Sequence, residues 1–211
     1  MPLDLYLIGL GHYDLQGSQR LEKLLLQIFP DIVSVEYDKQ AVKGINLLEK
    51  AKKSPQAMRA FIENLCAKGN YNPENVRQII PVLNFEYFVA RDYCKKWGKP
   101  LLFSDFGDKN LSQRDFDLIL SRPVQATQEL IERVYQNNVI PIPPEEVPNL
   151  MKRDEYTETK LRPLAAGRDS RKVLHVAGAW HLFGNYYNLY ERLRDLNPTR
   201  IMLNQADYVY I

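Results

Sequence analysis

Two of the three histidines in the 211-residue chain occur in the same short pattern, Gly-x-x-His, which runs from Gly9 to His12 and again from Gly178 to His181. Each pattern directly follows an apolar run of the kind that forms a buried strand. Glycine lets the chain leave a strand in a tight turn, and the histidine then lies just beyond the strand. Because imidazole exchanges protons near neutral pH and is a common metal ligand, both positions are candidates for chemistry.

Two carboxylates follow apolar runs in the same way, Glu36 after 32–35 and Asp105 after 100–104. In an open parallel α/β sheet, binding and catalytic sites form outside the carboxyl ends of the strands. We therefore expect these carboxylates to share one edge of the sheet with His12 and His181. Two imidazoles and a carboxylate in one crevice could bind a divalent metal, or could serve as base and orienting group for a water.

Each of these residues also has a simpler interpretation, since strands commonly end where the chain meets solvent. For Asp105 a helix-capping or structural hydrogen bond is favoured over a catalytic role. Asp38 is an alternative to Glu36 as a ligand. His175 lies inside its apolar run, which is typical of a histidine buried in the core.

Apolar runs separated by helical segments predict an α/β fold with a largely parallel central sheet flanked by helices. A first helix is expected from Ser18, as its N-cap, with apolar positions at i, i+3, i+4 and i+7. The whole chain, 1–211, is expected to form a single domain. Its helical stretch 38–99 is longer than a crossover needs and predicts an insertion that acts as a lid or a side lobe. Strands are expected at 4–8, 32–35, 100–105, 172–177 and 200–203, with an edge strand at 208–211.

The composition excludes several classes of protein. Hydrophobic residues make up 45% and charged residues 26%, which is ordinary for a globular domain. The net charge of +2 argues against a protein that binds nucleic acid or an anionic membrane surface. Apolar runs are far shorter than the roughly 20 residues of a membrane span, and the first residues form no secretory signal. These observations predict a cytoplasmic protein.

Three blocks of the sequence resemble the TraB/PrgY/Tiki superfamily, in the order that this family has them. The stretch 9–38 is similar to its opening, with a Gly-x-x-His and then a strand that leads into Val-Glu-x-Asp. The stretch 152–161 is similar to its Glu-Arg-Asp helix start, and 176–185 to its second Gly-x-x-His. A looser match covers 98–114, so that the resemblance extends from about residue 5 to 193.

The resemblance implies an α/β core shared with the erythromycin-esterase and ChaN-like proteins. It also implies a metal-dependent hydrolase of peptidase type, because Tiki members are metal-dependent proteases. His12, Glu36 and His181 would form the metal or water-activating centre, with Mn, Co or Zn as the divalent ion. Arg153 would supply a fixed positive charge for an oxyanion or a substrate carboxylate.

The chain departs from the family pattern at several positions. Lys152 stands where the family often has Glu, Thr157 replaces Met, Trp180 replaces a small residue, and Phe106 stands where relatives often have Arg. The expected partner is a peptide or a small-molecule substrate, and no nucleic-acid partner is expected. The chain could also form a homo-oligomer. The alternative is a non-catalytic, regulatory module on the same fold that binds a peptide or another ligand.

Overall fold

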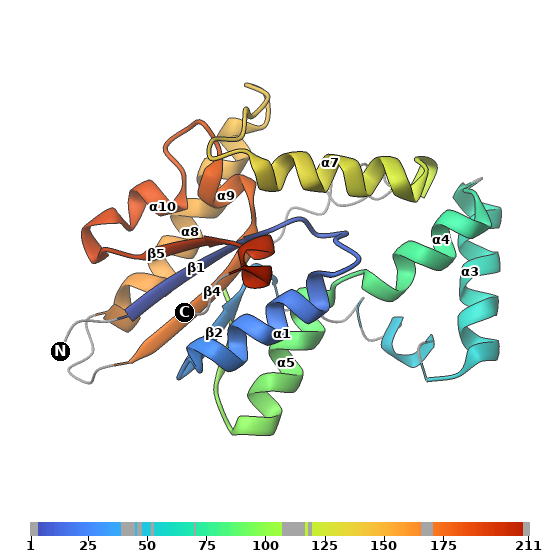
Figure 1. Cartoon of the computed structure of the whole chain (residues 1–211), viewed down its shortest axis with the longest axis horizontal. Helices are drawn as coiled ribbons and strands as arrows, with labels where there is room; N and C mark the ends of the chain where they lie inside the picture. Colours follow the sequence, from blue (N-terminus) through green and yellow to red (C-terminus); the bar gives the residue numbers. More distant parts are fainter. Residues whose placement is uncertain are drawn as a thin grey trace.

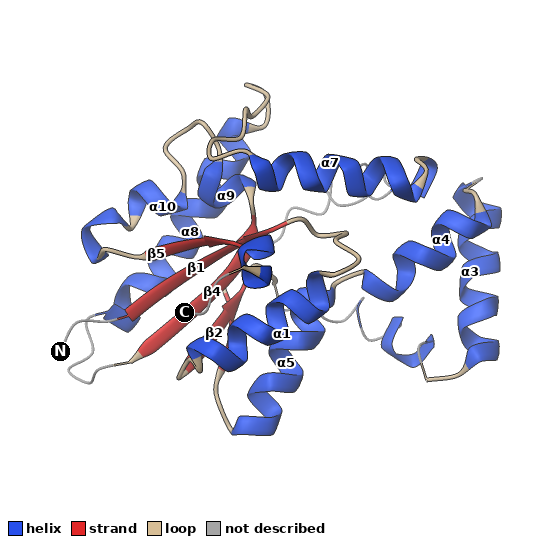
Figure 2. Ribbon diagram, viewed as in Figure 1, coloured by secondary structure: helices blue, strands red, loops and turns tan. Residues whose placement is uncertain are grey.

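A computed structural model describes residues 4–38, 45, 48–51, 53–69, 71–106, 117, 120–165 and 171–208. Its centre is a five-stranded sheet in the order β3-β2-β4-β1-β5, and every pair of neighbouring strands is parallel (Figure 2). The strands are β1 (Asp4–Leu10), β2 (Ile32–Val35), β3 (Leu101–Phe103), β4 (Lys172–Gly178) and β5 (Thr199–Met202). The predicted α/β fold with a parallel sheet is confirmed.

Helices cover both faces of this sheet. Figure 1 shows α1 and α5 side by side on one face, and α8, α9 and α10 on the other. Strands buried on both faces are continuously apolar rather than alternating, and β2 and β4 follow this rule, with Val33, Val35 and Val176 almost fully buried. The helix bounds are α1 (Gly17–Ile28), α5 (Phe85–Trp97), α7 (Val124–Gln136), α8 (Val147–Ala165), α9 (Trp180–Phe183) and α10 (Leu189–Arg192).

The long helical insertion between β2 and β3 is also present. It contains α3 (Pro55–Gly69), α4 (Pro73–Ile79) and the short 3-10 helix η1 (Ile80–Val82), and it ends with α5. Figure 1 shows α3 and α4 beyond the edge of the sheet, whereas α5 packs on it beside α1. A second apolar cluster, separate from the main core, includes Ile62 of α3 and Val76 and Ile79 of α4. The insertion therefore has a peripheral part, whose apolar cluster also includes Val124 of α7, and a central part, α5.

Three details differ from the expected elements. Helix α1 begins at Gly17 with Gln16 at its N-cap rather than Ser18, because the backbone N–H of Gln16 and of Gly17 donate to the Asp14 side chain and carbonyl. The third strand is confined to β3, and the chain after Met202 turns into the 3-10 helix η3 (Leu203–Asp207). Tyr208 then lies in a turn rather than a strand, and 209–211 are outside the described residues.

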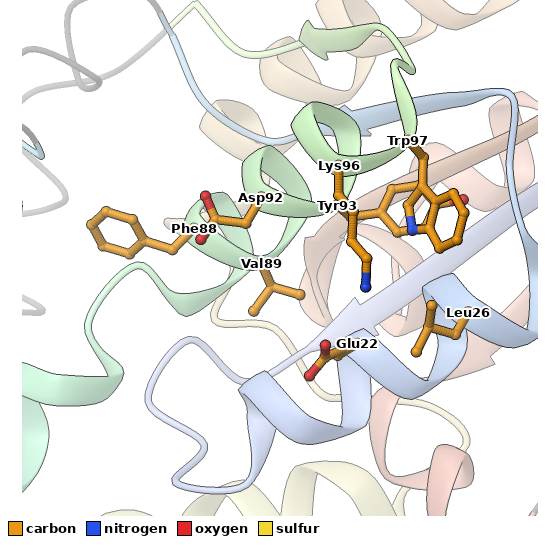
Figure 3. Close-up of a pocket in the computed structure, with 8 residues that line it drawn as sticks. All are labelled: Glu22, Leu26, Phe88, Val89, Asp92, Tyr93, Lys96 and Trp97. Carbon is orange, nitrogen blue, oxygen red and sulfur yellow. The ribbon is translucent and has the colours of Figure 1, made fainter.

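A surface cavity lies between α1 and α5 and includes Glu22 and Asp92 in its lining (Figure 3). None of the predicted site residues lines it. In the part of the chain that the structure describes, no helix combines the length and the apolar character needed to cross a membrane.

The buried His175 of β4 makes the stability of the fold sensitive to acid. Its side chain is 0% exposed, and its Nδ1 lies 3.1 Å from Ser34 Oγ, while Nε2 has no hydrogen-bond partner among the described residues. Burial lowers the pKa of His175 to about 4. As the pH falls, the imidazole of His175 therefore becomes protonated near pH 6.5 in the unfolded chain but only near pH 4 in the folded protein.

We expect His175 to cost about 3 kcal/mol of folding free energy as the pH falls from about 6.5 to 4. Urea unfolding of wild type and His175→Gln across this range measures the effect. The difference in unfolding free energy between the two proteins should shift in favour of the variant at low pH, and a constant difference would contradict the assignment.

Candidate functional site

The four residues predicted from strand ends lie together at the carboxyl edge of the sheet. Leu10 of β1 pairs with Gly178 of β4, and Val35 of β2 pairs with Val176, so the segments that follow these strands begin next to one another. A Cβ placed on Gly178 would lie 2.9 Å from His12 Nε2, 3.6 Å from Glu36 Oε2 and 3.7 Å from His181 Cδ2. His12, Glu36 and His181 therefore surround one point, directly above the end of β4.

Glu36 is the hub of this cluster. Its Oε1 lies 2.8 Å from His181 Nε2 and accepts a hydrogen bond from Arg153 Nη2, and its Oε2 accepts from the backbone N–H of Gly178 at 2.7 Å. Burial opposes its charge, but the charges of His181 and Arg153 and the His181 hydrogen bond hold the pKa of Glu36 well below its ordinary value. Glu36 is thus a fixed anion, and it is a poor base.

His181, on the short helix α9, is held between two carboxylates. Its Nδ1 lies 2.5 Å from Asp154 Oδ1, and Asp154 in turn accepts a hydrogen bond from Tyr186 at 2.7 Å. The side chain is only 6% exposed. Burial lowers the pKa of His181, but Glu36 and Asp154 outweigh it and raise the pKa to about 9. His181 is therefore an imidazolium at neutral pH, with both ring nitrogens donating.

Arg153 reaches the same cluster from helix α8. Its Nε and Nη2 donate to the two oxygens of Asp105 at 3.2 and 2.7 Å, in addition to the bond to Glu36. The Thr157 hydroxyl, one turn further along α8, donates to the carbonyl of Ser104 at 2.7 Å and fixes the helix on the strand end. Asp105 thus has the structural hydrogen-bonding role that the sequence favours for it, and it orients the guanidinium.

His12 differs from His181 because its side chain is 46% exposed. Its Nδ1 lies 2.9 Å from Glu86 Oε1, and the same oxygen accepts the Tyr37 hydroxyl at 2.7 Å. Its Nε2 is the nitrogen that faces Gly178. Desolvation lowers the pKa of His12, but the hydrogen bond and charge of Glu86 reverse this and leave the pKa raised.

Helix α7 fixes the turn that carries His12. The Tyr135 hydroxyl of α7 accepts from the backbone N–H of Gly11 at 3.1 Å and donates to Asp14 Oδ2 at 2.9 Å. Arg20 of α1 donates to the same carboxylate oxygen at 2.9 Å. Because this network is buried and polar, it specifies one conformation of the turn.

Exposed aromatic side chains adjoin the cluster in sequence. Trp180, next to His181, is 38% exposed, and Phe106, next to Asp105, is 41% exposed and lies edge-on to Tyr156 of α8 with ring centroids 5.5 Å apart. Such surfaces suit an apolar or aromatic group on a ligand.

The sequence did not single out the two carboxylates that orient the histidines. Asp154 is only weakly indicated as a site residue, since it follows Arg153 in the stretch that is similar to the family's Glu-Arg-Asp helix start. Glu86 is not indicated at all, because it lies in the insertion, 74 positions from His12. Glu36 contacts both Arg153 and His181.

The three predicted ligands have the chemistry of a divalent metal site, and each imidazole has its Nδ1 on a carboxylate, as metal-binding histidines often do. In this structure, two of the three groups bond directly to each other. His181 Nε2 donates directly to Glu36 at 2.8 Å, and Arg153 occupies the same oxygen. Among the described residues, no group of three or more His, Cys, Asp or Glu side chains is arranged to hold a metal ion. Metal binding by His12, Glu36 and His181 stays a prediction.

A methyl group on Gly178 is a steric probe of this centre. Because its Cβ would lie 2.9 Å from His12 Nε2, Gly178→Ala should displace the half-exposed imidazole while the surrounding core stays in place. We expect turnover to fall by at least about 10-fold, with a melting temperature within a few degrees of wild type. Parallel kinetics and thermal unfolding test this, and unchanged turnover would contradict the placement of His12.

Comparison with family models, with curated proteins and with solved structures finds no match to this chain.

Proposed function

We propose that this protein is a hydrolase of the TraB/Tiki type, which cleaves a peptide or a small ester with a water activated at the His12, Glu36 and His181 centre. The observation that carries the proposal is the convergence of these three side chains around Gly178, with Arg153 bonded to the same carboxylate. Fixed charges beside an accessible imidazole are the elements that acyl transfer to water needs.

His12 is the residue best suited to be the general base. Both nitrogens of His181 are already engaged by Glu36 and Asp154, and the acceptor oxygens of Glu36 are taken by His181, Arg153 and Gly178. His12 combines an exposed ring with an Nε2 that faces the centre. A base must be reachable by the water that it deprotonates, and His12 meets this condition.

Arg153 and His181 supply positive charge in a site that is largely shielded from water. The side chain of Arg153 is 19% exposed and that of His181 is 6% exposed. Glu36 fixes the position of both cations. Cations that are fixed before the reaction stabilise, through their charge, the negative oxygen that develops on a carbonyl in the transition state.

The proposed reaction has two steps. In the first, His12 Nε2 accepts a proton as the water oxygen bonds to the carbonyl carbon, and the charge on the carbonyl oxygen is stabilised by Arg153 and His181. In the second, the carbon–nitrogen or carbon–oxygen bond breaks, and the departing amine or alcohol takes the proton from His12. Trp180 and Phe106 favour substrates that carry an apolar group near the bond.

The alternative is a module that binds a peptide or another ligand without turnover. It is favoured by the mutual pairing of Glu36, Arg153, His181 and Asp105, which leaves these four side chains bonded to one another. Under this alternative, the intact protein would bind ligands from a peptide panel and convert none, and His12→Ala would leave binding largely intact.

A panel of peptide and ester substrates tests the proposal, assayed with and without added Mn, Co or Zn and with a chelator. The proposal expects turnover that depends on His12 and favours an apolar residue beside the cleaved bond. Metal analysis of the purified protein and titration of each ion decide the predicted metal dependence separately. Absence of turnover across the panel in every condition would contradict hydrolase function.

A further inference from the structure

We infer that Glu86, which the helical insertion contributes, is a positioning residue that sets the ring orientation and the tautomer of His12. This inference rests on the proposed function of His12 as base. It assigns a role in the site to α5, a helix that the sequence marked only as part of a lid or lobe.

The geometry of the contact carries the inference. Glu86 lies in the first turn of α5, and its Oε1 is 2.9 Å from His12 Nδ1. The Tyr37 hydroxyl donates to the same oxygen at 2.7 Å and fixes the carboxylate from the segment that follows β2. In a neutral imidazole one nitrogen carries the proton and the other the lone pair. An Nδ1–H that donates to Glu86 leaves the lone pair on Nε2, the nitrogen that faces Gly178.

The burial of Glu86 costs folding free energy, which a purely structural role does not explain. Its side chain is only 4% exposed, and its ion-pair partner within the described residues is the half-exposed His12. Its second oxygen, Oε2, is buried and has no hydrogen-bond partner among those residues. A buried carboxylate that is incompletely paired costs stability rather than adding it. Proteins tolerate such groups mainly at functional sites.

This cost separates a positioning role from a structural one. If Glu86 served the fold, its replacement would lower stability and activity together. If it positions His12, the isosteric Glu86→Gln removes the buried charge without loss of stability, and Glu86→Ala frees the imidazole to rotate and to change tautomer. Asp92, an exposed acid on the same helix that lines the cavity of Figure 3, provides the matched control variant Asp92→Asn.

The test reads the tautomer of His12 directly, by long-range ¹H–¹⁵N NMR of the histidine rings at a pH where imidazole is neutral. Wild type and Asp92→Asn should show His12 with its proton on Nδ1. Glu86→Ala should show a mixture in which the Nε2–H form is populated. The signals of the buried His175 and His181 should stay unchanged in every variant, which identifies a local effect.

Kinetics and thermal unfolding complete the test. We expect kcat to fall by about 10- to 100-fold in Glu86→Ala with KM little changed, while Glu86→Gln melts at or above the wild-type temperature. An unchanged His12 tautomer in Glu86→Ala would overturn the inference, and so would a loss of kcat that only parallels a loss of stability. If wild type turns over no substrate, the proposed hydrolase function fails, and the NMR spectra still decide whether Glu86 orients His12.

Discussion

His12→Asn is expected to reduce kcat/KM by about 100- to 10,000-fold, the range for loss of a general base. Asparagine lacks the basic nitrogen at the Nε2 position, yet its amide can donate to Glu86, so the buried carboxylate keeps a partner. The fold should therefore survive the change. Steady-state kinetics on the best substrate of the panel, together with thermal unfolding, measure both effects.

Leu15→Ala is the control for this substitution. Leu15 lies in the same turn and is 40% exposed, so truncation of its side chain should leave turnover near wild type. Turnover by His12→Asn within a few-fold of wild type would remove His12 from the mechanism. An equal loss in Leu15→Ala would show that the turn as a whole, rather than the imidazole, controls activity.

Glu36→Ala should be the most destabilising change in the cluster, at about 3–5 kcal/mol of unfolding free energy. Arg153, whose side chain is 19% exposed, would keep only Asp105, and the imidazolium of His181 would keep only Asp154. Removing the anion that they share leaves two poorly hydrated cations next to each other with one carboxylate each instead of two. The pKa of His181 should fall as well, because the charge of Glu36 is one of the causes that raise it.

Urea unfolding of Glu36→Ala beside Glu22→Ala measures this effect. Glu22 is an exposed acid on α1 at the cavity of Figure 3, and its loss should change the unfolding free energy by less than about 0.5 kcal/mol. A Glu36→Ala protein as stable as this control would show that Glu36 is not the anion that holds Arg153 and His181 in place.

The sheet and the meeting of four site residues were predictable from the sequence, because parallel strands bring their carboxyl ends to one edge. His12, Glu36, Asp105 and His181 needed only that rule. The prediction of Arg153 depended on the family resemblance, since nothing in the local pattern of α8 indicates that the Arg153 side chain reaches the end of β2. The predicted N-cap at Ser18 was wrong. Helix α1 begins at Gly17, because the Asp14 side chain organises the turn before it.

The two carboxylates that orient the histidines, Glu86 and Asp154, could not be predicted from the sequence, for a physical reason. Glu86 meets His12 only because the long insertion returns α5 to the face of the sheet beside α1 (Figure 1). Periodicity predicts that such a helix exists, but not which of its polar residues becomes buried.

The difference in exposure among the three histidines allows the most direct test of the central claim. His175 is fully buried and the side chain of His181 is 6% exposed, whereas the side chain of His12 is 46% exposed. A histidine acylating reagent such as diethyl pyrocarbonate should therefore modify His12 first in the intact wild-type protein. Mass spectrometry locates the acyl group, and residual hydrolysis is measured on the same samples. The account predicts that activity is lost in proportion to acylation of His12, while His175 and His181 stay unmodified. Full acylation of His12 with hydrolysis retained would contradict it.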